Sequence, residues 1–118
     1  MRLDDYCTNR WPELWQFFGG YFHEDFMDDY GSPEGAIDAF LSNTNPEYVQ
    51  KVLNQLEEYL AFSREYLSKH PEKDDWYPVE SMGVHYLPSA DGYTAIGWLE
   101  HVLERFREYL ARIQGQRQ

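Results

Sequence analysis

The stretch NPEYVQKVLNQLEEYLAFSREYL, residues 45–67, carries a complete helix signal and decides the fold class. Asn45 can cap a helix, Pro46 suits the first helical turn, and Glu47 complements the positive end of the helix dipole. Behind that start, apolar residues recur on one helical face: Val49, Val52, Leu53, Leu56, Leu60 and Leu67. The pattern predicts a long amphipathic helix over about 46–68.

Two further helix starts carry the same kind of signal. Ser32 followed by Pro33 predicts a helix over about 33–42. Near the C-terminus, Thr94 can cap a last helix, which the apolar spacing extends to about residue 113. Each of these helices has one apolar face, so each needs a neighbour to pack against.

An aromatic stripe marks the first helix, predicted over about 11–23. Its members have helical spacing and are expected in the core: Trp11, Leu14, Trp15, Phe18 and Phe22. A longer helix would carry Asp25 and Asp29 into the same apolar face, and burying unpaired carboxylates is costly. The helix is therefore predicted to end between His23 and Phe26 and to be followed by an acidic connection.

A long connection separates the last two helices. Residues 69–93 carry three prolines and two glycines without sustained periodicity, which is typical of an irregular segment. A helical turn near 79–82 and a short extended piece over 84–87 are expected within it. The predicted fold class is all-α, a compact bundle of four to five helices with one long irregular connection at about 69–93. Residues 1–118 are expected to form a single domain.

Charge is the most informative bulk property of the chain. Its 21 Asp and Glu residues outnumber its 10 Lys and Arg residues, which gives a net charge of −11. Such a surface repels phosphate backbones, so direct nucleic-acid binding is not expected. It would attract a basic protein in a salt-dependent way. The alternative is that the acidity serves only solubility.

Compartment and assembly follow from simple counts. No apolar stretch reaches the roughly 18 residues that a membrane-spanning helix needs, so no membrane association is expected. The one cysteine, Cys7, fits a reducing compartment, and the expected localisation is cytoplasmic. The expected state is a monomer, with a weak dimer through exposed aromatic side chains as the alternative.

A metal or catalytic site is poorly supported. His23 is followed at the third and fourth positions by Phe26 and Met27, where a metal-binding helix would present ligands. His23 is expected instead to contact a neighbouring carboxylate or carbonyl and to stabilise the end of the first helix. Cys7 has neither a second cysteine for a zinc site nor a helix start directly behind it. We expect no catalytic residue, no metal and no cofactor.

Exposed carboxylates and one aromatic pair are the candidates for contact with a basic partner. Trp76 and Tyr77 lie in the long connection beside acidic residues, which resembles the anchor and rim of a protein-binding patch. Equally, Trp76 could fold back and hold the connection against the bundle. The candidate contact residues are Asp28, Asp29, Glu57, Glu58, Glu72, Asp74, Asp75, Trp76 and Tyr77.

Three segments together resemble a known family. They are WPELWQFFGGYFHEDFMDDYGSPEGAIDAFL at 11–41, NPEYVQKVLNQLEEYL at 45–60 and MGVHYLPSADGYTAIGWLEHV at 82–102. In content and order they resemble one branch of the immunity proteins of bacterial contact-dependent growth inhibition systems. The block from Tyr21 to Glu34 is the most specific part, and residues 68–81 depart from the family pattern.

The resemblance implies an immunity-protein-like helical domain without enzymatic activity. Such a cytosolic protein binds and neutralises the C-terminal toxin domain of a surface-delivered effector, and many of these toxins are basic nucleases that attack tRNA. Two other functions stay open: an acidic scaffold or adaptor that binds a basic protein unrelated to toxins, and a metal-dependent enzyme using His23 and Asp25.

The resemblance also assigns two layers to the block at 21–34. One set of side chains is expected to build the corner between the first two helices: Tyr21, Phe22, His23, Asp25, Phe26 and Tyr30. Glu24, Asp28 and Asp29 are expected to face solvent and to add to the acidic field.

Overall fold

The computed structural model describes residues 9–72 and 77–116, and all regular structure within them is helical. The helices are α2 (Pro12–Tyr21), α3 (Phe26–Tyr30), α4 (Pro33–Asn43), α5 (Pro46–Lys69), α6 (Tyr77–Glu80) and α7 (Ala95–Gln116), with a 3₁₀ helix, η1 (Pro88–Asp91). The predicted all-α class is confirmed. Of the predicted contact residues, Asp74, Asp75 and Trp76 lie outside the described residues, as does Cys7.

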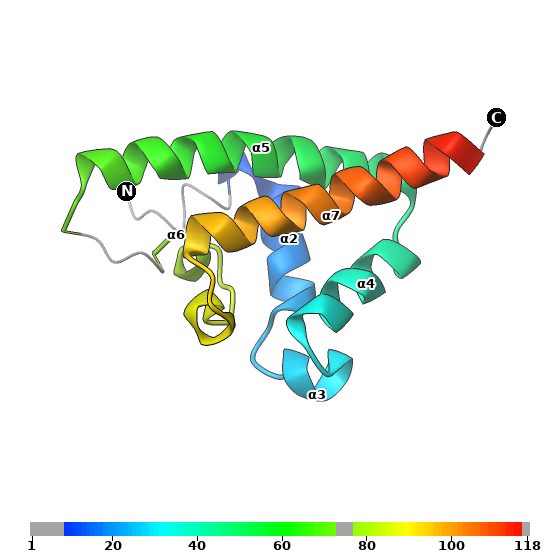
Figure 1. Ribbon diagram of the computed structural model, residues 1–118, viewed down its shortest axis with the longest axis horizontal. Helices are drawn as coiled ribbons and strands as arrows, with labels where there is room; N and C mark the ends of the chain where they lie inside the picture. Colours follow the sequence, from blue (N-terminus) through cyan, green and yellow to red (C-terminus); the bar gives the residue numbers. More distant parts are fainter. Residues whose placement is uncertain (1–8, 73–76, 117–118) are drawn as a thin grey trace.

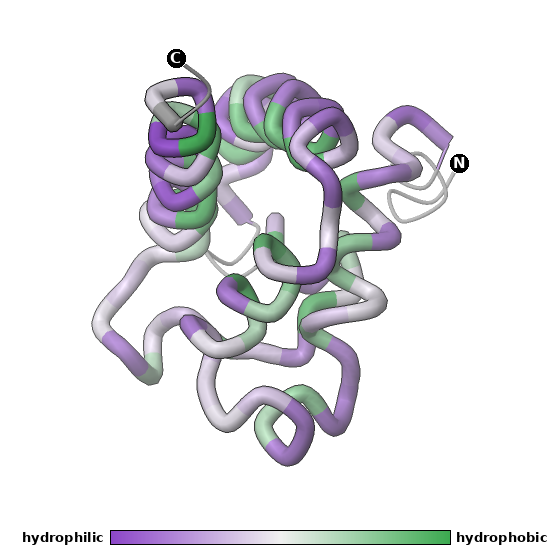
Figure 2. The backbone as a smooth tube through the Cα atoms, turned by 90° about the vertical axis from the view of Figure 1, so that its right-hand side faces the viewer, coloured by the Kyte–Doolittle hydropathy of each residue, from purple (hydrophilic) through white to green (hydrophobic). Residues whose placement is uncertain are grey.

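Two long helices form one layer of the molecule. α5 and α7 pack against each other and run in opposite directions across the top of the view in Figure 1. The shorter helices α2, α3 and α4 lie below them, and the view along the long axis shows the same division (Figure 2). No other described helix therefore covers the outer face of α5 and α7.

Three of the predicted helix starts, at Ser32, Asn45 and Thr94, are confirmed by capping hydrogen bonds. The Ser32 hydroxyl accepts from the Gly35 N–H at 2.9 Å, and the Asn45 side chain accepts from the Tyr48 N–H at 2.8 Å. Thr94 Oγ1 accepts from the backbone N–H three residues later at 2.9 Å. Each cap satisfies a backbone donor that the first helical turn leaves free.

The first helix ends at Tyr21, two residues before the predicted range, and the segment behind it contains a helix that the sequence analysis missed. α2 ends at Tyr21, and α3 begins at Phe26 within the expected acidic connection. The Phe26 side chain is only 2% exposed, so tertiary burial stabilises this short helix. Gly31 ends it at φ 80°, a left-handed conformation that favours glycine.

The long connection is more ordered than expected around its middle. The helical turn predicted near 79–82 is α6 followed by a turn, and the Tyr59 hydroxyl donates to the Pro78 carbonyl at 2.5 Å, which attaches this segment to α5. The piece at 84–87 is not a strand in the described structure. One backbone hydrogen bond, from the His85 N–H to the Phe22 carbonyl at 2.9 Å, fastens it to the end of α2.

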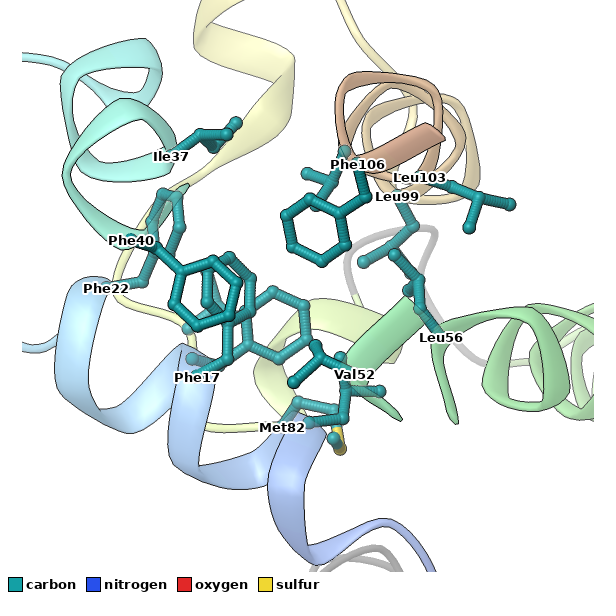
Figure 3. Packing of buried hydrophobic residues seen from close by; sticks show 14 of the residues in the cluster. Phe17, Phe22, Ile37, Phe40, Val52, Leu56, Met82, Leu99, Leu103 and Phe106 are labelled. Atoms are coloured by element: carbon teal, nitrogen blue, oxygen red, sulfur yellow. The ribbon is translucent and has the colours of Figure 1, made fainter. Parts of the chain in front are cut away.

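Aromatic rings from three helices meet at the centre of the core. Phe17 of α2 lies 4.5 Å from Phe40 of α4 and 5.3 Å from Phe106 of α7, measured between ring centroids, and the three side chains point toward one another in Figure 3. The predicted stripe is buried except for Trp15, which is half-buried, whereas Phe17 was not predicted in the core and is 1% exposed. α2 lies between the long helices and α4, so it is buried on more than one face.

Candidate functional site

The acidic corner consists of four carboxylates, Glu24, Asp25, Asp28 and Asp29, on and just before α3. The His23 side chain contacts two residues of this corner. Its Nδ1 accepts from the Asp25 N–H at 3.1 Å, and its Nε2 lies 3.1 Å from Asp29 Oδ2. The two contacts together require the proton on Nε2, which can then be donated to Asp29. The expected contact between His23 and a neighbouring carboxylate is confirmed.

Apolar and aromatic packing forms the inner side of this corner. Phe22 and Phe26 are buried with ring centroids 5.3 Å apart, and Tyr21 stacks on Tyr30 at 5.5 Å. These residues build the corner as expected. Burial also raises the pKa of the Tyr30 hydroxyl above its usual value, with smaller contributions from Tyr21 and Asp29.

The carboxylates point away from that inner side. Glu24, Asp28 and Asp29 are exposed, as expected. Asp25 takes part in the corner through its backbone, because its carbonyl accepts from the N–H groups of Asp28 and Asp29 at 3.0 and 3.1 Å, while its side chain is exposed. The corner therefore presents four negative charges on its outer side.

Elsewhere, many carboxylates are neutralised by the chain's own cations. On the long helices, Glu100 lies 2.6 Å from Arg64 and Glu57 lies 3.4 Å from Arg107. Further ion pairs join Lys51 to Glu13, Lys69 to Glu65, and Arg105 to both Glu34 and Asp38. Within the described residues, no lysine or arginine pairs with the acidic corner. The acidic corner therefore concentrates four negative charges in one short segment.

The structure separates the predicted contact residues into distinct places. Asp28 and Asp29 lie on α3, on the side of the molecule opposite α5, which carries Glu57 and Glu58 (Figure 1). Glu57 lines a groove between α5 and α7, and Glu58 is exposed. These two pairs cannot contact one small area of a partner together.

Of the remaining candidates, the structure describes Glu72 and the backbone of Tyr77. Glu72 follows that helix and lies 3.2 Å from His70. Tyr77 begins α6, and its side chain lies outside the described structure, as do the residues between them. Glu72 is thus separate in the chain from both pairs discussed above.

Three exposed apolar side chains were missed by the sequence analysis. Met27 is 53% exposed, Leu87 is 55% exposed and Tyr93 is 36% exposed. Met27 belongs to the acidic corner's helix, and Leu87 belongs to the segment fastened to the end of α2. Their exposure has no sequence signal, because it depends on which face of a short helix or loop is covered.

Histidine and tyrosine contacts elsewhere are structural. His101 Nε2 lies 2.6 Å from Glu34 Oε1, so α7 and the start of α4 are joined there. The Tyr86 hydroxyl donates to Asp91 at 2.5 Å; burial, followed by that carboxylate, raises the pKa of Tyr86 far above its usual value. In the part of the chain that the structure describes, no three His, Cys, Asp or Glu side chains gather closely enough to hold a metal ion.

The described helices also bear on membrane association. Among them, none combines the length and the apolar character that a membrane crossing requires.

Comparison with known proteins gives one match. The model of the CdiI immunity protein family matches residues 10–106, which include all of α2 to α6 and the first half of α7. No curated protein and no solved structure matches the chain. The chain belongs to the CdiI immunity protein family, whose members are non-enzymatic inhibitors that neutralise toxins of contact-dependent growth inhibition.

Proposed function

We propose that this protein acts in the cytoplasm as a single domain that binds its cognate toxin domain one to one, and that this toxin is a basic nuclease, for example one that cleaves tRNA. The observation that carries the proposal is the net charge of −11 together with the uncompensated carboxylates of the acidic corner. The family accounts for toxin neutralisation, and the charge supports the class of toxin.

The physical reason lies in what a nuclease must bind. A cleft that holds a polyanion is lined by lysine and arginine, so a folded acidic protein can occupy it by presenting carboxylates where phosphates would lie. Arginine side chains of the toxin would bind those carboxylates in bidentate pairs, which give direction as well as attraction. Opposite net charges would also accelerate the encounter in a salt-dependent way.

The contact residues are part of this proposal. They are Asp28 and Asp29 of the acidic corner, Glu57 and Glu58 of α5, and five residues that follow α5 in the sequence: Glu72, Asp74, Asp75, Trp76 and Tyr77. Glu57 is less available to a toxin than Asp28, because Arg107 already lies 3.4 Å from it.

The test uses the toxin domain that this proposal places at the 3′ end of a large gene directly upstream. Its cleavage of tRNA is followed at a fixed toxin concentration while this protein is added. We expect activity to fall linearly to zero at one equivalent, and the affinity to weaken as salt rises. Binding to a toxin that cleaves no nucleic acid would refute the nuclease assignment alone. Absence of binding would refute the pairing and favour the adaptor function.

A further inference from the structure

The large exposed apolar side chains of the described residues come from outside the two long helices. Met27, Leu87 and Tyr93 belong to α3 and to the segment that leads into α7, and none of the three is on α5 or α7. The Tyr93 side chain already packs within the molecule, because its ring stacks on the ring of His101 with centroids 5.6 Å apart. Met27 and Leu87 are more exposed than Tyr93, at 53% and 55%.

The backbone around Met27 and Leu87 belongs to one packed unit. The ring of Phe26, next to Met27, lies 6.2 Å from the ring of Tyr86, next to Leu87. The His85 N–H also donates to the Phe22 carbonyl at 2.9 Å. Burial of Phe22 and Phe26 fixes this unit against the core, so its exposed residues are presented on a rigid support.

Exposed apolar side chains beside uncompensated charge favour one kind of partner. Met27 follows Glu24 and Asp25 and precedes Asp28, and all three carboxylates are exposed without a lysine or arginine partner in the described structure. A partner that covers Met27 must also approach these charges, so its surface must carry cations around an apolar pocket. Methionine adapts its shape to such a pocket more readily than branched side chains do.

The face formed by α5 and α7 offers a basic partner fewer free carboxylates and less exposed apolar surface. The groove between α5 and α7 is lined by Leu60 and Leu103, which are only 2% and 7% exposed. Two ion pairs, Arg64–Glu100 and Arg107–Glu57, lie among its lining residues. A basic partner there would meet arginines first and would have to compete with them for the carboxylates.

Resting on the proposed function, we infer that the toxin docks on the α3 side of the molecule, where Met27 and Leu87 make the apolar contacts and Glu24, Asp25 and Asp28 bind surrounding basic side chains. This inference narrows the set of contact residues proposed above, because the outer face of α5 and α7, which carries Glu57 and Glu58, stays free in this complex. The toxin's share of the interface is an apolar pocket edged by arginine or lysine.

The first test compares two charge-matched double variants. Glu24→Gln with Asp28→Asn and Glu58→Gln with Glu104→Gln each remove two exposed carboxylates and change the net charge from −11 to −9. The association rate constant with the purified toxin domain is measured at low and moderate salt. We expect a decrease of about three- to tenfold for the α3 pair and of less than about twofold for the long-helix pair. Equal decreases would show a general charge effect and would overturn the inference.

The second test concerns the apolar contacts. Met27→Ala with Leu87→Ala should weaken the equilibrium affinity about ten- to fiftyfold, because both half-exposed side chains would be covered in the complex. Met27→Leu is the matched control and should retain affinity within about threefold, since it conserves apolar volume. Thermal unfolding of each variant verifies folding. If wild-type protein binds the toxin and the double alanine variant binds equally well, the docking surface is wrong; if wild-type protein does not bind, the proposed function fails instead.

Discussion

Replacement of Phe17 by alanine tests the centre of the fold. The Phe17 side chain is 1% exposed and contacts rings of α4 and α7, with Phe40 at 4.5 Å and Phe106 at 5.3 Å. Removing a fully buried phenylalanine side chain costs about 3–5 kcal/mol of unfolding free energy, because apolar burial is lost and a cavity remains. Since small domains are stable by only about 5–15 kcal/mol, Phe17→Ala should remove a large share of the total.

Urea unfolding followed by tryptophan fluorescence measures this loss. We expect a lower transition midpoint with an unchanged slope, which indicates a change of stability and not of the denatured state. Phe62→Ala is the matched control, because Phe62 lies on α5 and is only partly buried. It should cost about 1–2 kcal/mol. If Phe17→Ala costs no more than Phe62→Ala, the central packing of three helices described above is incorrect.

Three further predictions concern single interactions. Arg105→Ala removes the ion pairs of a side chain that is 23% exposed with two carboxylates of α4, and it should lower the unfolding free energy by about 1 kcal/mol at low salt. Arg107→Ala should lower it by less, because Arg107 is more exposed. Equal losses in the two variants would contradict the expected effect of burial on these ion pairs. Asn45→Ala removes the α5 cap and should cost about 1 kcal/mol in thermal unfolding, whereas Asn45→Asp should retain most of the stability. The pKa of Tyr86 is raised in the folded protein, so its contribution to stability is present below the unfolded tyrosine pKa of about 10 and is lost above it; Tyr86→Phe should flatten the fall of stability between pH 9 and 11, and an unchanged fall would contradict this assignment.

Helix starts could be predicted from the sequence because their signals are local. The capping side chains of Ser32, Asn45 and Thr94 each bond to a backbone N–H three residues later, so residue type and spacing suffice. α3 could not be predicted in this way. It is five residues long and is stabilised by burial of Phe26 against Phe22 and Tyr86, contacts that exist only after the chain folds.

The aromatic core shows the same limit. A single helical stripe correctly placed Phe18 and Phe22 inside, but it placed Trp15 too deep and omitted Phe17. Periodicity identifies one apolar face, whereas α2 has neighbours on several sides. Which aromatic residue meets both α4 and α7 depends on the crossing of three helices.

By itself, the sequence determined the helical class, the helix starts, the family resemblance and the excess of negative charge, because these depend on composition and on neighbours within a few residues. Tertiary structure alone decided which carboxylates pair with a lysine or arginine of the chain and which remain available to a partner. Glu57 meets Arg107 fifty residues away, and Arg105 reaches α4 from α7, while the acidic corner receives no such cation within the described residues. It also decided that Met27 is exposed beside those carboxylates. The physical reason is that ion pairing and burial join residues distant in the chain, so only the packed helices determine which charges and apolar side chains remain for a partner.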